Sequence, residues 1–93
     1  MDLKITRQKI DRIDKEIAKL FEERMKCVEE VIHYKIENNL EIFDEIREKI
    51  VVEKNKKLIS DKKYEKYYVE FIKDVMKISK NYQRDILKNK NIK

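Results

Sequence analysis

Three cations lie where a helical pattern predicts apolar side chains. Hydrophobic residues recur every three or four positions along the first part of the chain, as on one face of a helix: Ile10, Ile13, Ile17, Leu20, Val28 and Val31. The same step lands on Arg24 and Lys35, and Arg7 continues it backwards. An inward cation without a partner costs several kcal/mol, so these residues predict carboxylates inside, from the protein or from a ligand. For each cation alone, a side chain at the edge of the stripe that reaches solvent is the alternative.

Polar residues interrupt two later segments as well. Ser79 and Gln83 share one helical face with the apolar side chains of Tyr68, Ile72, Val75 and Ile86. A serine that bonds back to its own helix and a glutamine at the edge of a stripe are the structural alternatives. Asp44, Arg47 and Glu48 crowd the predicted start of another helix. A helix cap explains Asp44 well and leaves Glu48 open.

These residues must be positioned by helices. The chain has 93 residues and contains neither glycine nor proline, which removes the usual residues of tight turns. The charged fraction of 46% would suggest disorder in an apolar-poor chain, but 41% hydrophobic residues at helical spacing predict folded amphipathic helices. We therefore predict an all-α fold and one domain over residues 1–93, with three helices, one long, one short and one medium.

The expected helix bounds follow from caps and breaks. The predicted ranges are about Lys4 to Asn38, Asp44 to Ile59 and Lys62 to Leu87, with Ile46, Ile50 and Leu58 of the second facing the core. The Asn38-Asn39 and Ser60-Asp61 pairs mark the breaks, and residues 88–93 are expected to form a flexible basic tail.

The first helix is too long for its own chain to cover. Its roughly 35 residues span about 52 Å at 1.5 Å per residue. A compact globule of this length has a radius of gyration near 12 Å by the usual scaling. We therefore expect a second chain to cover the remainder of the rod.

Composition excludes several kinds of protein. Cys27 and His33 are the only residues of their types and are six positions apart, so neither a metal site nor a Cys-His catalytic pair is expected. Cys27 lies beside the apolar stripe and is expected to be a buried thiol. Without glycine the chain has no phosphate-binding loop. Its net charge of +5 comes mostly from alternating Lys and Glu, which makes nucleic acid a weak candidate partner. The charged start and the short apolar runs favour a soluble, cytoplasmic protein without a membrane partner.

The order of these polar residues resembles a known family. The strings Arg7-Gln-Lys-Ile-Asp11-Arg-Ile-Asp14, Glu23-Arg24, Val31 to Lys35, Asp44-Glu-Ile-Arg47-Glu48 and Ser79-Lys-Asn-Tyr-Gln83 are similar to those of the all-helical chorismate mutases. The resemblance covers the chain from Arg7 to Gln83. It implies an intertwined homodimer that rearranges chorismate to prephenate, in phenylalanine and tyrosine biosynthesis, without a cofactor or metal. In that family an intramolecular pericyclic shift breaks an ether bond, so the protein supplies orientation and electrostatic stabilisation.

The resemblance also implies a role for each residue. Catalytic roles fall on Lys35 and Gln83, as donors to the ether oxygen, and on Arg24 and Glu48. Arg24 and Arg7 resemble the clamps on the two substrate carboxylates, for which a guanidinium offers a bidentate fork. Glu48, with the backbone at Asp44, resembles the pair that holds the substrate hydroxyl. Arg47 and Ser79 would line the site near a carboxylate, and Val31 would form an apolar wall.

Helix geometry adds one expectation of its own. Arg7 and Arg24 are 17 positions apart, about 25 Å along a helix, which is too far for both to hold one small molecule. Arg24 and Lys35 are 11 positions apart, about 16 Å, which two long side chains can bridge around a ligand. Arg7 is therefore expected to come from the other chain.

Two other functions fit parts of the pattern. An isochorismate pyruvate lyase of the same fold would share the paired cations, although the constellation from Asp44 to Glu48 with Ser79 favours the mutase. A non-catalytic helical dimerisation module is the alternative from another class. Sustained heptads, which such a module needs, are interrupted here by too many polar residues.

Overall fold

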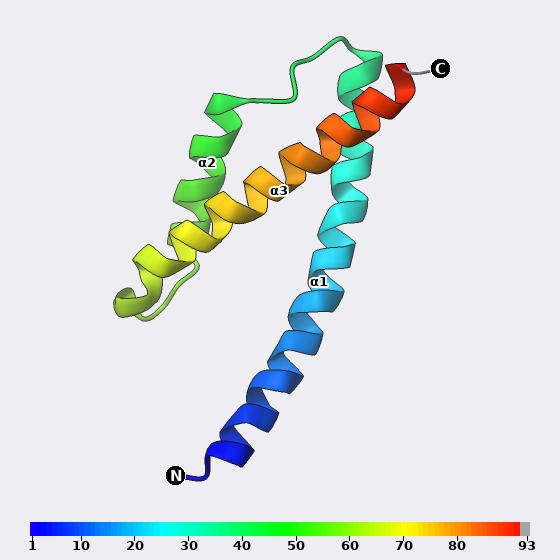
Figure 1. Cartoon of the computed structure of the whole chain (residues 1–93). Coiled ribbons are helices and arrows are strands. Elements are labelled where there is room, and N and C mark those ends of the chain that lie inside the picture. Colours follow the sequence, from blue (N-terminus) through cyan, green and yellow to red (C-terminus); the bar gives the residue numbers. More distant parts are fainter. Residues whose placement is uncertain (92–93) are drawn as a thin grey trace.

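Three α-helices and one short 3₁₀ turn account for most of the chain. The computed structural model describes residues 1–91, with helices α1 (Leu3–Glu37), α2 (Glu45–Lys56) and α3 (Glu65–Asn91), and a 3₁₀ turn η1 (Lys62–Tyr64) before α3 (Figure 1). No strand occurs in this range. The predicted all-α class, with one long, one short and one medium helix, is confirmed.

Aspartates cap the helical segments at their starts. Asp2 Oδ1 accepts a hydrogen bond from the Lys4 amide at 2.9 Å, and Asp44 Oδ1 accepts one from the Arg47 amide at 3.0 Å. Asp61 caps η1 in the same way. These carboxylates satisfy amides that have no partner within the helix. The predicted cap at Asp44 is thereby confirmed.

The connection from α1 to α2 turns without glycine. Asn38 is the C-cap of α1, and its side-chain amide donates to the Tyr34 carbonyl at 2.8 Å. Asn39 follows with φ 54°, the only positive φ among residues 1–91. Asparagine tolerates this left-handed conformation better than most residues do. The Asn38-Asn39 break lies where the sequence predicts it.

Two helix ends differ from the sequence prediction. Helix α2 stops at Lys56, so the expected continuation to Ile59 is wrong. Helix α3 runs on to Asn91, so Lys88–Asn91 are helical rather than part of an irregular tail; residues 92 and 93 lie outside the described range. Lys88 and Lys90 in the last turn interact favourably with the C-terminal end of the helix dipole, which favours a helical conformation in this basic segment.

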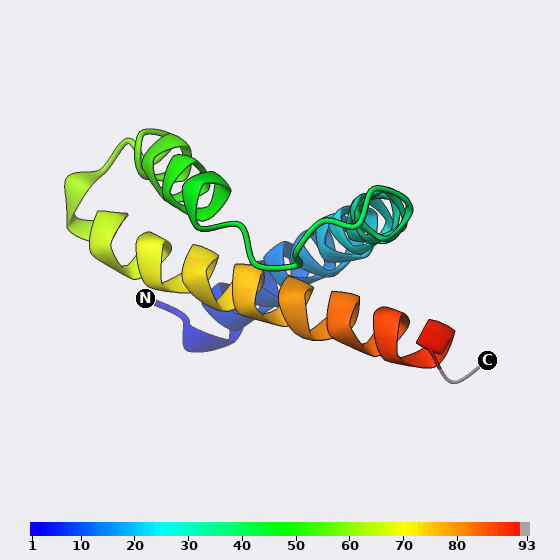
Figure 2. The same ribbon diagram turned by 90° about the horizontal axis from the view of Figure 1, so that it is seen from above.

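Helix α3 joins the other two helices. It packs against α2 along its first half and crosses the C-terminal half of α1 further on (Figures 1 and 2). The buried apolar side chains of the described residues are Val28 and Ile32 of α1 and Ile72 and Met76 of α3, and Ile32 is the one that is fully buried. The core of the single chain therefore lies at the crossing of α1 and α3, with α2 along its flank.

Some predicted core positions face solvent within one chain. Ile46, Ile50 and Leu58 are 75%, 43% and 70% exposed, whereas Val51 and Val52 of α2 are half-buried. On α1, Ile32 is 1% exposed whereas its neighbour Val31 is 45% exposed. The periodicity predicted the apolar face of each helix, but the position of the neighbouring helix decides which residues on that face are buried.

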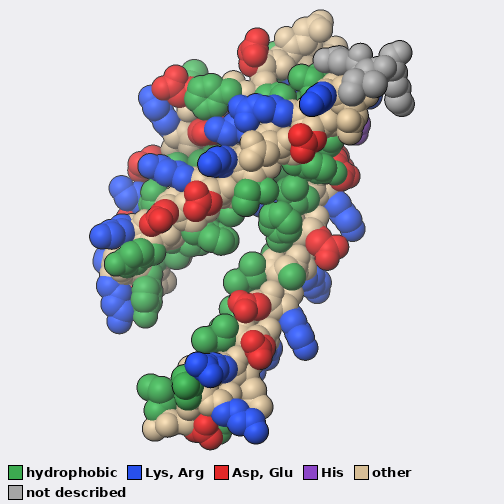
Figure 3. All heavy atoms as spheres, in the orientation of Figure 1, with side chains coloured by type: hydrophobic (Ala, Val, Ile, Leu, Met, Phe, Trp, Pro, Cys, Tyr) green, Lys and Arg blue, Asp and Glu red, His purple; other side chains and the backbone are tan. Residues whose placement is uncertain are grey.

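The first half of α1 projects from the rest of the molecule. The radius of gyration is 16.7 Å and the principal extents are 56 × 27 × 14 Å, well beyond the value near 12 Å for a compact chain of this length. Ile10, Ile13, Ile17 and Leu20 are each about half exposed, and Figure 3 shows this arm standing clear of α2 and α3. No helix within residues 1–91 is both long and apolar enough to cross a bilayer.

Candidate active site

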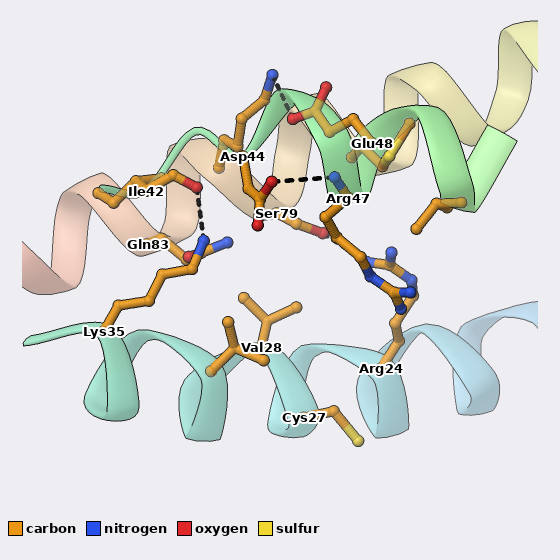
Figure 4. A pocket seen from close by; sticks show the side chains of 14 residues that line it. Arg24, Cys27, Val28, Lys35, Ile42, Asp44, Arg47, Glu48, Ser79 and Gln83 are labelled. Atoms are coloured by element: carbon orange, nitrogen blue, oxygen red, sulfur yellow. Dashed lines mark hydrogen bonds and ion pairs between the residues drawn. The ribbon is translucent and has the colours of Figure 1, made fainter. Parts of the chain in front are cut away.

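A cavity of about 290 Å³ opens between the three helices (Figure 4). Of the residues singled out in the sequence, eight line it: Arg24, Val31, Lys35, Asp44, Arg47, Glu48, Ser79 and Gln83. They come from all three helices and from the cap that opens α2. Residues far apart in the chain thus meet around one space of small-molecule size.

Arg24 reaches across the cavity from α1 to α3. Its Nη1 donates to the Ser79 hydroxyl at 2.5 Å, and that hydroxyl donates in turn to the Val75 carbonyl at 2.9 Å. Ser79 therefore donates to its own helix, which was the purely structural role considered for it. It also accepts a hydrogen bond that orients the Arg24 guanidinium. The other nitrogens of Arg24 keep donors that can bind a carboxylate.

Lys35 carries the second cation of α1 into the cavity. Its side chain is half-buried, and Nζ donates to the Ile42 carbonyl at 2.6 Å in the connection between α1 and α2. Figure 4 shows the ammonium pointing toward Gln83 between the helices. This hydrogen bond fixes a cation that still has two free N–H donors.

The start of α2 supplies the acidic side of the cavity. The Asp44 carboxylate accepts from the Arg47 amide and its carbonyl accepts from the Glu48 amide at 3.0 Å, so the backbone N–H of Asp44 is the group left for other contacts. Glu48, one turn on, forms an ion pair with Lys80, whose Nζ lies 3.0 Å from Glu48 Oε2. Arg47 lies between Asp44 and Glu48 in sequence, and this exposed residue also lines the cavity. Glu48 thus has a role beyond the cap.

Gln83 is a buried amide with one unsatisfied atom. The residue is only 6% exposed, and its Oε1 has no hydrogen-bond partner in the described part of the chain. Buried side-chain polar atoms are nearly always paired, and exceptions often lie at catalytic or binding sites. The buried Gln83, together with the buried Ser79, confirms that the polar interruption of α3 faces inward.

Arg7 lies outside this cavity. It is exposed on the projecting arm of α1, and the unbroken helix keeps it about 25 Å from Arg24 along the axis. Within one chain, therefore, the structure brings together all the predicted site residues except Arg7.

Six lining residues were not predicted from the sequence as part of the site: Cys27, Val28, Ile42, Val51, Met76 and Lys80. The four aliphatic or thioether side chains form apolar walls. Cys27 is an exposed free thiol that points away from the other labelled side chains in Figure 4, whereas a buried thiol was expected. Lys80 follows Ser79 directly in sequence, and that adjacency was the only available signal for it.

One hydrogen bond ties α1 to α3 close to the cavity. Tyr82, next to Gln83, donates its hydroxyl proton to Glu29 Oε2 at 2.6 Å. This hydrogen bond, with desolvation and the nearby negative charge, raises the pKa of the Tyr82 phenol. The pair fastens the two helices that carry Arg24 and Gln83.

The charge of the cavity favours an anion. Four basic side chains, Arg24, Lys35, Arg47 and Lys80, and two acidic ones, Asp44 and Glu48, line it, an excess of two positive charges. No group of three His, Cys, Asp or Glu residues is placed to hold a metal within residues 1–91. The fixed donors can orient a small dianion and stabilise charge that develops on it.

Fold and site together define an all-helical protein with a cationic cavity for a small polar molecule. The family model described as chorismate mutase type II matches residues 6–84, and the chain belongs to this family. Its activity is that of a chorismate mutase, an isomerase whose substrate is chorismate. No curated protein and no solved structure matches the chain.

Proposed function

We propose that the protein converts chorismate to prephenate in two identical cavities of a homodimer, each completed by Arg7 of the partner subunit. The observation that carries this proposal is the meeting of eight polar and apolar site residues, from all three helices, around one cavity. The product would serve phenylalanine and tyrosine biosynthesis, and we expect the enzyme to work in the cytoplasm.

The charge balance of the cavity supports this substrate. Chorismate carries two carboxylates, and the lining residues supply an excess of two positive charges. Arg24 is already oriented by Ser79 at 2.5 Å, so it can bind one carboxylate without first giving up its rotamer freedom. Arg7 of the partner subunit would bind the other carboxylate.

The reaction needs no proton transfer or covalent intermediate. Arg24 and Arg7 of the partner subunit would hold the substrate in its compact reactive conformer, which removes much of the entropic barrier. Lys35 and the Gln83 amide would then donate hydrogen bonds to the ether oxygen as its bond breaks and negative charge grows on it. Glu48 and the backbone at Asp44 would hold the substrate hydroxyl, with Val31 as an apolar wall.

The projecting arm of α1 supports the dimer. Its half-exposed isoleucines and leucine form an apolar stripe that the rest of the chain leaves uncovered. Burial of such a stripe against a second copy contributes about 25 cal/mol per Å² of apolar surface. A twofold arrangement would cover both arms and bring each Arg7 toward the partner's cavity.

The direct test is loss of chorismate absorbance on addition of purified protein, followed by identification of the product. Prephenate is the expected product. Lys35→Ala should lower kcat by about 10²- to 10³-fold and raise KM much less, because a donor to the breaking bond acts mainly in the transition state. Near wild-type turnover in this variant would remove Lys35 from the proposed role.

The same assay distinguishes the lyase alternative. Incubation with isochorismate and measurement of released pyruvate would reveal lyase activity. We expect turnover of chorismate to exceed it, because the site has fixed donors on several sides of the cavity. Faster pyruvate release than prephenate formation would overturn the proposed reaction.

A further inference from the structure

A lysine that the sequence analysis did not assign lies in the wall of the cavity. Lys80 of α3 and Glu48 of α2 form an ion pair at 3.0 Å, and their side chains are only 21% and 27% exposed. The other ion pairs within residues 1–91 join residues at most four positions apart. The pair of Lys80 and Glu48 is thus the one that connects two helices, and it does so at the proposed site.

An aromatic ring holds the same ammonium from another side. Lys80 Nζ lies 4.9 Å from the ring centroid of Phe43, in the connection that precedes α2. A cation at this distance from a ring is attracted by its negative face. Carboxylate and ring together fix the ammonium, so Lys80 is less free than a surface lysine.

The ion pair also separates two hollows. Glu48, Lys80 and Met76 line the proposed site and, on their other side, a second hollow of about 680 Å³ between α2 and α3. The Glu48 carboxylate can therefore turn toward the substrate or away from it. The ion pair with Lys80 of α3 restricts the orientation of this carboxylate.

The negative charge of Glu48 is the reason why the position of Lys80 matters. In the proposed function Glu48 accepts a hydrogen bond from the substrate hydroxyl, yet its carboxylate faces a dianion. Like charges repel strongly where water is partly excluded. Arg24 and Lys35 also face the cavity, but they donate to Ser79 and to the Ile42 carbonyl. Arg47 is exposed, and the ion pair that Glu48 forms among the described residues is with Lys80, so Lys80 is the cation in direct contact with Glu48.

We infer that Lys80 is a positioning residue of the site, which holds the Glu48 carboxylate toward the substrate hydroxyl and neutralises its charge against the substrate dianion. The inference rests on the proposed function, because it acts through the role of Glu48. It adds a residue that does not itself contact the reacting atoms.

A double-mutant cycle tests this inference. Lys80→Met keeps the length of the side chain and suits a helix, and it should raise KM for chorismate about 10-fold while kcat changes less than about twofold. In a Glu48→Gln background the same change should alter KM less than about twofold, because no charge remains to be balanced. Lys80→Arg should restore most of the affinity. Lys77→Met, on the same helix and lining only the second hollow, is the matched control and should behave like wild type.

The outcomes separate the two proposals. An inactive wild-type protein, or a Glu48→Gln variant with unchanged kinetics, would contradict the proposed function of the site. An active wild type with an unchanged KM in Lys80→Met, or with an equal KM effect in both backgrounds, would overturn the inference about Lys80 alone. Lys80→Gln provides a second neutral side chain, and helicity by circular dichroism identifies any variant that fails to fold. An equal loss in Lys80→Gln and Lys80→Arg would also refute the charge argument.

Discussion

Arg7→Ala and Lys35→Ala are each expected to be nearly inactive alone and to restore activity when the two chains are mixed. Helix α1 runs unbroken from Leu3 to Glu37, so Arg7 and Lys35 are 28 positions apart, about 42 Å along the axis. No small metabolite spans that distance. If both residues are needed at one site, they must come from different chains.

The size of the recovery follows from the pairing of chains. Random association of equal amounts makes about half of the dimers mixed. In a mixed dimer, one cavity takes Lys35 from the Arg7→Ala chain and Arg7 from the Lys35→Ala chain, so it is intact, whereas the other cavity carries both substitutions. About one quarter of the wild-type sites, and hence about one quarter of the activity, should return if the sites act independently.

The assay is loss of chorismate after joint unfolding and refolding of the two purified variants. A second mixture, Arg24→Ala with Lys35→Ala, is the matched control. Both of its residues line the cavity of one chain, so every mixed site carries one substitution or the other and no activity should return. Refolding each variant alone measures the background.

Two results would refute the shared-site reasoning. No recovery in the Arg7 and Lys35 mixture, with dimers present by sedimentation, would mean that each site is built within one chain. Equal recovery in the Arg24 and Lys35 mixture would mean that the two residues of this cavity are not used together.

Three further predictions concern the pH dependence and the assembly. The wild-type rate should be nearly flat from neutral to mildly alkaline pH, because the Gln83 amide does not titrate. Gln83→Glu should confine activity to acid pH, near the ordinary carboxyl pKa of about 4.3, because only the protonated acid donates to the ether oxygen. Identical kcat/KM profiles for the two proteins would place Gln83 outside the site. The hydrogen bond to Glu29 raises the pKa of Tyr82, so its stabilisation is present below the unfolded pKa of about 10 and disappears as pH rises through the folded value. Tyr82→Phe should therefore unfold in less denaturant than wild type near neutral pH, with the difference closing above about pH 10, and a difference that persists there would contradict this linkage. On dilution, sedimentation should show dimers until helicity by circular dichroism is lost, and a folded, helical monomer would disprove obligate pairing.

Most of the fold could be predicted from the sequence because the starts and ends of the helices depend on local signals such as caps and breaks. The start of α2 followed from Asp44, which can cap only what comes after it, and the two breaks followed from Asn38-Asn39 and Ser60-Asp61. The third helix was expected from Lys62, but Lys62–Tyr64 form the 3₁₀ turn and α3 begins at Glu65. Polar residues on apolar faces predicted the site for a similar reason, since an inward Arg24 or Gln83 needs a partner.

Features that depend on how the helices cross could not be predicted from the sequence. Which of Val31 and Ile32 is buried is decided by the line along which α3 crosses α1. Lys80 reaches Glu48 only because α2 lies alongside α3, and a lysine in a Lys-rich helix carries no mark of that contact. Helical periodicity identifies the apolar face of a helix, whereas the packing of the neighbouring helix decides which residues of that face are buried.

The turn at Asn39 has a consequence for how this protein can change over generations. In a chain without glycine, Asn39 adopts φ 54° within the connection that reverses the path between α1 and α2. A β-branched residue there would cost roughly 1–2 kcal/mol, whereas glycine would be accepted readily. The reversal sets the place of the Ile42 carbonyl that receives Lys35 and of the Asp44 cap. A survey of random variants should therefore find this position among the most restricted in the connection, although its side chain does not line the cavity.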